Sequence, residues 1–217
     1  ARVNVALFGG TFDPVHSGHL SAAQAAMQAF ALDQIHFVPA SIPPHKRDRP
    51  LTSFAHRYAM VALACAGVPQ FIPSLLEASE QRGEEVNYSI VTVRKLAALL
   101  SPEDRLYFLI GADAFLDVPQ WRESAALLDS CDFIIVSRPG FSIEEIEKAV
   151  PAELRAGRAN GKCIPLRRTS LHLLTTVQAD VSSSTIRSLA AEGKSLCGLV
   201  PDWVGDYIQK LQLFHES

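Results

Sequence analysis

The sequence predicts an α/β fold in which helices cover both faces of a doubly wound parallel sheet. Short apolar runs alternate with longer helix-forming segments along the chain, which is the pattern of such folds. Two of these runs, at residues 106–110 and 133–136, are apolar throughout, as expected for parallel strands buried on both faces. Because crossovers between parallel strands are right-handed, few other topologies remain.

The first half of the chain predicts a strand, a helix, a strand, a helix and a strand. The apolar run at residues 3–8 ends in two glycines, which indicates a buried strand that opens into a loop. The alanine-rich stretch at 21–31 favours a helix, and a strand at 34–38 follows it. The remaining two elements are a helix at 53–66 and a strand at 71–76.

The second half continues the alternation. Ser142 and Glu145 have the spacing of a capping box at the start of a helix that ends near residue 154. Pro201 is expected at the first position of the final helix. The other predicted elements are helices at 89–100, 121–128, 182–192 and 201–213 and a last strand at 171–177.

The composition describes a folded protein with no polymeric anion as its partner. Of 217 residues, 48% are hydrophobic, which rules out disorder. We expect one domain over residues 1–217 with a helical C-terminal part from about residue 182, because no stretch resembles a linker. Against 23 Asp and Glu there are 20 Lys and Arg, so the net charge is -3, which argues against nucleic acid and membrane surfaces. The sequence does not predict the oligomeric state.

Cysteine spacing and hydropathy predict a cytoplasmic location. Cys65, Cys131, Cys163 and Cys197 lie far apart and form neither a metal-binding nor a disulfide pattern, which fits a reducing compartment. No run approaches the about 20 apolar residues of a membrane-spanning helix. The apolar run at residues 3–8 is too short for a signal peptide.

The loop after the first strand is the first place to look for a ligand, because ligands of doubly wound sheets bind beyond the carboxyl ends of the strands. Gly9 and Gly10 let the backbone approach a bulky anion, and Gly18 does so near the start of the next helix. The free N–H groups and the dipole of that helix favour an anion without any net positive charge on the protein.

Two histidines stand three residues apart in this loop. His16 and His19 can both face its mouth if the helix begins near Ser17. A polyphosphate there would raise their pKa values and favour the protonated form, in which both ring nitrogens donate. The alternative is that the histidines cap the helix or pack beside it. The loop is neither a P-loop nor a Gly-x-Gly-x-x-Gly fingerprint, because its glycine spacing differs from both.

The eleven residues of this loop, 9–19, read Gly-Gly-Thr-Phe-Asp-Pro-Val-His-Ser-Gly-His. The segment resembles the signature of the nucleotidylyltransferase superfamily of the His-x-Gly-His type, and most closely that of the bacterial nicotinate-nucleotide adenylyltransferase family. The resemblance implies a Rossmann-like fold and a nucleotide site to which Thr11 and Phe12 also contribute.

A second segment is similar to the family's Ile-Ser-Ser-Thr-x-Ile-Arg motif. Here Val181 replaces the isoleucine, Ser182 and Ser183 match, and Ser184 replaces the threonine while keeping a hydroxyl group. The resemblance implies that these serines and Arg187 bind phosphate oxygens, for which hydroxyls, helix N–H groups and a guanidinium are suited. A plain helix cap with a solvated arginine is the alternative.

Two further matches concern the phosphates and the nucleoside. His45 and Lys46 end a Pro-Pro-His-Lys run, which in the family lies near the reacting phosphates. Gly111 and Asp113 follow a predicted strand and match the family's Gly-x-Asp motif. The resemblance implies that this motif contacts the nucleotide ribose or, indirectly, a metal ion. Arg138 follows the next strand and could approach the adenosine.

The last matches concern a site for a nicotinate group. Asn87, Tyr88 and Ser89 stand where the family has Ser-Tyr-Thr, and the resemblance implies that the backbone at Tyr88 and Ser89 binds the nicotinate carboxylate. An ordinary helix N-cap would use the same residues. Trp121 matches Pro-x-Trp, whose indole stacks on the pyridine ring, and a structural tryptophan that anchors a short helix is the alternative.

The resemblance implies transfer of AMP from MgATP to nicotinate mononucleotide, giving nicotinate adenine dinucleotide and pyrophosphate in NAD biosynthesis. The mononucleotide phosphate would attack the α-phosphorus in line, so no protein nucleophile is needed. His19 is expected at the α-phosphate, with His16, Lys46 and Arg187 at the β and γ phosphates. Mg²⁺ is expected to bridge phosphates and to be held by substrate and water rather than by protein ligands.

Two alternatives remain open on the sequence. One is an adenylyltransferase that acts on nicotinamide mononucleotide or on another phosphorylated small molecule such as pantetheine phosphate. The other is a nucleotide-binding module without catalytic activity. That module would be expected to lack one of the histidines or Arg187, and all of these residues are present.

Overall fold

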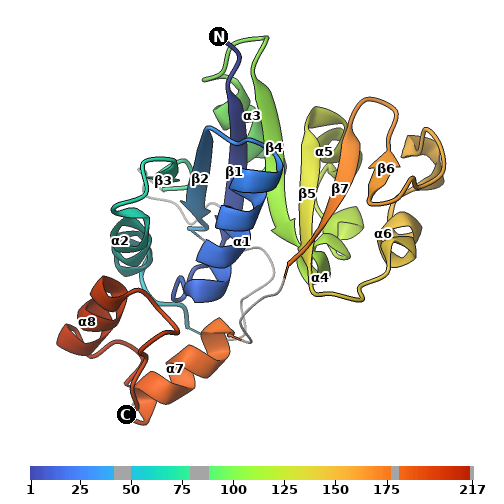
Figure 1. Ribbon diagram of the computed structural model, residues 1–217. Coiled ribbons are helices and arrows are strands. Elements are labelled where there is room, and N and C mark those ends of the chain that lie inside the picture. The colour runs from blue at the N-terminus through green and yellow to red at the C-terminus, as the bar shows by residue number, and fades with distance from the viewer. Residues whose placement is uncertain (42–49, 79–87, 177–180, 216–217) are drawn as a thin grey trace.

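The computed structural model describes residues 1–41, 50–78, 88–176 and 181–215. Its strands form one sheet in the order β3-β2-β1-β4-β5-β7-β6 (Figure 1). The strands are β1 (Asn4–Gly10), β2 (Gln34–Pro39), β3 (Phe71–Pro73), β4 (Arg105–Gly111), β5 (Asp132–Ser137), β6 (Cys163–Pro165) and β7 (Ser170–Thr175). Every pairing is parallel except that of β6 with β7. This confirms the predicted α/β fold, and the antiparallel strand β6 is an addition to it.

Helices cover both faces of the sheet. In Figure 1, α1 lies across one face with α2 beside it and with α7 and α8 below, while α3, α4 and α5 lie behind. The helices are α1 (Ser17–Ala29), α2 (Phe54–Cys65), α3 (Ser89–Ala97), α4 (Ala112–Phe115), α5 (Ser124–Ser130), α6 (Ile143–Ala149), α7 (Ser183–Ala191) and α8 (Asp202–Lys210). Two 3₁₀ turns, η1 (Val118–Gln120) and η2 (Ala152–Leu154), complete the elements of the described residues.

Alternation along β1 creates two separate cores. Ala6 and Phe8 point to the face that α1 and α2 cover, whereas Val5 and Leu7 point to the face of α3 and α5. All four side chains are at most 7% exposed, which is why the strand reads as a continuous apolar run. Burial of each large side chain of this kind stabilises the fold by about 1.5–3 kcal/mol.

Several predicted boundaries were wrong, each for a local reason. The predicted helix at 142–154 ends at Ala149, because Pro151 restricts Val150 to an extended conformation (φ −86°, ψ 129°). Its capping box does not form, since the Ser142 hydroxyl bonds to the Glu144 carboxylate instead. The predicted strand at 71–76 ends at Pro73, and the helix expected at 121–128 begins only at Ser124.

The N-terminal ends of two other helices also differ from the prediction. α1 begins at Ser17, four residues before the predicted start at 21, because His16 caps it. Pro201 occupies the N-cap of α8 rather than its first helical position. The end of α8 at Lys210 is three residues short of the prediction.

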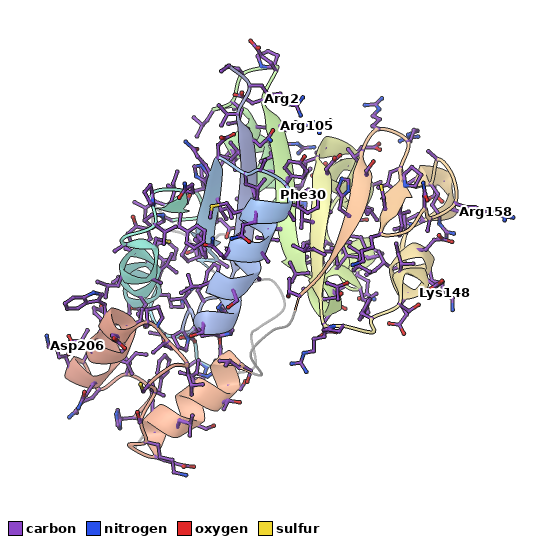
Figure 2. The ribbon with its side chains drawn as sticks, viewed as in Figure 1. Arg2, Phe30, Arg105, Lys148, Arg158 and Asp206 are labelled. Carbon is purple, nitrogen blue, oxygen red and sulfur yellow. The ribbon has the colours of Figure 1, made fainter. Side chains whose placement is uncertain are left out.

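The fold places one set of loops at the carboxyl ends of the parallel strands. In Figure 1 the arrows of the parallel strands point toward the end of the molecule where α7 lies, and β6 runs the other way. Figure 2 shows Phe30 and Arg105 at the opposite end, where α1 ends and β4 begins. No helix within the described residues is long and apolar enough to span a membrane.

Candidate functional site

The loop after β1 turns into α1 at His16, whose backbone is extended (φ −144°, ψ 175°). Its Nδ1 accepts a hydrogen bond from the Gly18 amide at 3.0 Å, and the His16 amide donates to Nδ1 of His19 at 3.1 Å. The two histidines thus form a reciprocal capping box, in places that Ser or Thr and Glu or Gln usually hold. The capping alternative from the sequence is confirmed, and a role with phosphates stays a prediction.

These capping bonds define the proton positions on both rings. Because each Nδ1 accepts, a neutral ring carries its proton on Nε2, which is then the nitrogen that can donate to a ligand. The rings are stacked with their centroids 3.7 Å apart. Burial lowers the pKa of His16 to about 4, so the ring is neutral at pH 7 in the protein without ligand. The protonated, doubly donating form is therefore not the resting state of His16.

Two glycines of the loop make room for aromatic rings of the protein itself. A Cβ on Gly18 would lie 2.9 Å from Cε1 of His16, and one on Gly10 would lie 3.3 Å from the ring of Phe12. The absence of a side chain at Gly18 thus serves the capping ring first. Phe12 is 2% exposed and packs edge-on against His19 with centroids 4.9 Å apart, so only its backbone remains for the predicted ligand contact.

The first residues of α7 dock on the loop after β1. The Ser183 hydroxyl donates to the carbonyl of Pro14 at 2.9 Å, and Nη1 of Arg187 donates to the carbonyl of Asp13 at 2.8 Å. Nη2 of Arg187 also donates to the hydroxyl of Ser184 at 3.1 Å. The fold therefore brings two motifs together that are about 170 residues apart in sequence.

The sequence left open that this motif is a plain helix cap with a solvated arginine, and the structure describes both residues concerned, Ser182 and Arg187. Ser182 is the N-cap of α7, with its Oγ accepting from the Thr185 amide at 3.1 Å, so the cap is confirmed. Arg187 is half-buried against the loop, unlike the solvated arginine of that alternative.

Arg57 of α2 lies beneath the same loop and is 1% exposed. Its guanidinium donates to the carbonyls of Thr11, Ala40, Ser41 and Thr52. The sequence prediction missed this residue. A signal was present, because position 57 lies four residues before Val61 and so on the apolar face of the predicted helix, where a charge is unexpected.

The residues predicted for the nicotinate group lie on the other face of the sheet. Tyr88 is the N-cap of α3, and the first turn of α3 contains no acidic residue. The guanidinium of Arg122 lies 4.6 Å from the centroid of the Tyr88 ring. Trp121 precedes Arg122 and is half-buried, with its ring 6.4 Å from that of Phe108. This is the packing expected of a structural tryptophan, and stacking on a ligand stays a prediction.

A buried carboxyl group supports the start of α3. Oε1 of Glu77 accepts from the Thr92 hydroxyl at 2.8 Å, and Glu77 is 9% exposed. Burial raises the pKa of Glu77 to about 7, although the bond from Thr92 and the charges of Lys95 and Arg57 oppose this shift. The sequence prediction did not single out Glu77 or Arg122.

The remaining predicted residues divide into two groups. Gly111, Asp113 and Arg138 are exposed at the carboxyl ends of β4 and β5, on the predicted edge of the sheet. His45 and Lys46 lie outside the described residues. Among the residues that the structure describes, no three His, Cys, Asp or Glu side chains gather into a metal-binding group.

A cavity of about 520 Å³ lies elsewhere, between α7 and α8. Ala190, Leu196, Val200 and Ile208 contribute to its lining. None of the described residues predicted for the site lines it, so it is separate from the loop after β1.

Comparisons with known proteins agree on one family. A family model described as cytidylyltransferase-like matches residues 7–189. A protein of Moorella thermoacetica, named probable nicotinate-nucleotide adenylyltransferase, is 38% identical over 210 residues, which are 97% of this chain and 91% of that protein. A protein of Solibacter usitatus with the same name is 40% identical over 199 residues, which are 92% of this chain and 93% of that protein.

Solved structures share the fold. The Plasmodium falciparum nicotinic acid mononucleotide adenylyltransferase complexed with NaAD matches with a TM-score of 0.70 at 21% identity and covers 98% of both chains. The same protein complexed with APC matches with a TM-score of 0.71 at 20% identity, again over 98% of both chains.

Proposed function

Because the chain belongs to the nicotinate-nucleotide adenylyltransferase family, we propose that it transfers AMP from ATP to nicotinate mononucleotide, with the loop after β1 as its phosphate site. The products are nicotinate adenine dinucleotide and pyrophosphate. The observation that carries the residue assignment is the docking of α7 on this loop, where Arg187 reaches the carbonyl of Asp13. A phosphate chain beside the loop then meets groups from both ends of the sequence.

The reaction needs alignment rather than a protein nucleophile. A phosphate oxygen of nicotinate mononucleotide forms the new bond to the α-phosphorus of ATP, and the bond to the leaving pyrophosphate breaks. The mononucleotide phosphate is already an anion at pH 7, so no general base is needed. Catalysis consists of holding two polyanions in line and stabilising the charge of the leaving group.

We assign Nε2 of His19 to the α-phosphate, because its Nδ1 is engaged in the cap of α1. The half-buried Arg187 is assigned to the β and γ phosphates, together with Lys46 and with Nε2 of His16. The helix dipole of α1 adds positive potential at this point, and no acidic residue in its first turn opposes it. The backbone of Gly9, Gly10 and Thr11 lines the approach.

Mg²⁺ is proposed to arrive with ATP and to neutralise phosphate charge. The described residues offer no group of three metal-ligating side chains, and Asp113 is the exposed carboxylate after β4. This donor set fits an ion that phosphate oxygens and water hold for the most part.

The nicotinate carboxylate is proposed to bind at the start of α3. Backbone N–H groups at Ser89 prefer a carboxylate to a carboxamide, whose amide end would also donate. The charge of Arg122, whose guanidinium lies over the ring of Tyr88, favours the acid for the same reason. Trp121 is assigned to the face of the pyridine ring.

The domain and location predictions remain part of this proposal. A site built from both ends of the chain fits a single domain over residues 1–217, because the loop after β1 and α7 must fold together. The four cysteines are free thiols, which fits the cytoplasm.

The test is an assay of pyrophosphate release with ATP and one acceptor at a time. The acceptors are nicotinate mononucleotide, nicotinamide mononucleotide and pantetheine phosphate, and the product is identified by mass spectrometry. We expect equal amounts of pyrophosphate and nicotinate adenine dinucleotide with the first acceptor. Turnover of pantetheine phosphate alone would point to a different adenylyltransferase, and binding of ATP without any product would point to a module without catalysis.

A further inference from the structure

Arg57 is the charged residue whose burial most needs an explanation. It is 1% exposed, whereas Figure 2 shows Lys148 and Arg158 pointing outward from the opposite side of the molecule. A buried guanidinium costs several kcal/mol unless hydrogen bonds replace its water. The groups that replace water at Arg57 therefore identify what the charge holds in place.

The guanidinium of Arg57 donates to backbone carbonyls in three stretches of chain and lies 5.7 Å from the centroid of the Phe54 ring. Nη1 donates to Thr11 at 2.9 Å in the loop after β1 and also to Ala40 after β2. Nη2 donates to Ser41 at 3.0 Å, and Nε donates to Thr52 at 2.8 Å just before α2. A rigid planar fork of donors fixes the relative positions of all three stretches.

Neighbouring bonds strengthen the same junction. The amide of Ala40 donates to the carbonyl of Gly10 at 2.9 Å, and the amide of Thr52 donates to Oδ2 of Asp13 at 3.4 Å. The loop after β1 is thus tied to the chain after β2 by a backbone bond and the guanidinium, and to the chain before α2 by a carboxylate and the guanidinium. Arg57 is the group that contacts all three stretches at once.

We propose that Arg57 is a positioning residue for the adenylyl transfer. It holds the loop after β1 at a fixed distance from the chain after β2 through their carbonyls. This rests on the proposed function, which places the ATP phosphates at the loop after β1. Misplacement of reacting groups by about 1 Å lowers turnover by about 100-fold. Tyr88 and Trp121 pack against the other core. The charge of Arg57 is the smallest of the causes that act on the pKa of Glu77 beside α3, so the loss of Arg57 is expected to change the preference for the nicotinate acid little.

The test compares two variants of Arg57 with a matched control. Arg57→Met keeps the length of the side chain and removes every donor, whereas Arg57→Lys keeps the charge and has one nitrogen to reach carbonyls in three stretches. The control is Tyr207→Phe, which removes the 2.8 Å bond between Tyr207 and Nδ1 of the adjacent residue, His56. This change weakens the contact of α2 with α8 and leaves the carbonyls of the loops alone.

Two measurements are made on each protein. In hydrogen exchange, the amides of Ala40 and Thr52, which bond to the loop after β1, are expected to exchange at least tenfold faster in Arg57→Met than in the control. In steady-state kinetics, kcat of Arg57→Met is expected to fall by about 100-fold, with KM for nicotinate mononucleotide and the acid preference within about threefold of the unchanged protein. The exchange rates and the kcat of Arg57→Lys are expected to lie between those of Arg57→Met and those of the unchanged protein.

Each outcome decides a separate question. If exchange at the amides of Ala40 and Thr52 matches the control, Arg57 does not hold the loops. If exchange rises but kcat matches the control, the loops are held without any effect on catalysis, and the proposal is wrong. If Arg57→Met does not fold, the same two measurements on Arg57→Lys decide. If the unchanged protein forms no dinucleotide, the proposed function fails, while exchange still reports on the contacts of Arg57.

Discussion

His19 caps α1, and the proposed function gives the same ring a second, chemical task. Its Nδ1 closes the first turn of α1, and this leaves Nε2 as the nitrogen that can donate to a ligand. His16 contributes the other half of the cap and stacks on His19 at 3.7 Å between centroids. Burial disfavours the charged form of His16 and lowers its pKa to about 4, so a neutral His16 is the form that the fold favours.

Replacement of His19 tests this double task. His19→Ala is expected to lower kcat by at least about 100-fold, because one hydrogen-bond donor to a charge that develops in the transition state is lost. The same change is expected to destabilise the fold by about 1 kcal/mol through the lost cap. Steady-state kinetics and urea unfolding measure the two effects.

A matched control separates the two effects. Ser53→Ala removes the cap of α2, where Oγ of Ser53 accepts from the His56 amide at 3.4 Å, and is expected to cost a similar stability without loss of turnover. Near-normal turnover of His19→Ala would show that its Nε2 does not act on the α-phosphate.

The lowered pKa of His16 predicts that the folded protein loses stability in acid. The pKa of His16 is about 4 in the folded protein and about 6.5 in the unfolded chain, so the unfolded chain binds more protons between these values. The contribution of His16 is complete above pH 6.5 and is lost as the pH falls toward 4. Unfolding experiments from pH 8 to pH 4 measure this loss. His16→Asn keeps a capping side chain and is expected to lose less stability over this range than the unchanged protein does. Equal losses in the two proteins would contradict the lowered pKa of His16.

The sequence alone singled out the loop after β1 and the start of α7, but not the internal partners of these segments. Glycines and histidines stand together in the sequence, so the loop could be recognised. Gly18 makes room for the ring of His16 only because the chain turns between the two residues, and the sequence does not show this turn. Arg57 and Glu77 depend on contacts between elements, which local patterns do not contain.

At the scale of elements, α3 begins beside a carboxyl group that is partly ionised at neutral pH. Oε1 of Glu77 accepts from Thr92 in the second turn of α3, and burial raises the pKa of Glu77 to about 7. A folded pKa above the ordinary value of 4.5 means that the folded protein binds the extra proton. The stability that this provides is complete below pH 4.5 and is lost as the pH rises through 7.

Glu77→Gln tests this pH dependence. Gln keeps an acceptor for Thr92 and carries no charge, so the variant is expected to gain stability relative to the unchanged protein as the pH rises from 5 to 8. The gain is on the order of 2 kcal/mol by the size of the pKa shift. Glu192→Gln, at an exposed position, is the control. A variant that becomes relatively less stable at pH 8 would contradict the pKa of Glu77.

Elements were predictable where hydrophobic periodicity was strong and less so at their ends. The central strands are continuous apolar runs, and each was placed correctly to within about three residues. β6 has three residues and pairs antiparallel at the edge of the sheet, too short for any periodicity to show. The prediction of one helix at 142–154 was wrong at Pro151, where α6 has already ended. The apolar residues beyond Pro151 keep the helical spacing, so the sequence pattern did not show this end.

At the scale of the whole molecule, two distant segments of the chain meet at the proposed phosphate site, on a protein of net charge -3. The loop after β1 supplies helix N–H groups and histidines, and α7 supplies Arg187, which lies against the loop. Local groups thus provide the positive potential that the overall charge lacks. This arrangement fits the proposed binding of small polyphosphates.

The most direct test of the proposed function is the ratio of kcat/KM for nicotinate mononucleotide to that for nicotinamide mononucleotide. ATP is held at a saturating concentration, and pyrophosphate release is measured for each acceptor under the same conditions. The proposed contacts of the carboxylate with the start of α3 and with the charge of Arg122 predict a ratio of at least about 10 in favour of the acid. Comparable values for the two acceptors, or a preference for the amide, would contradict the proposed function.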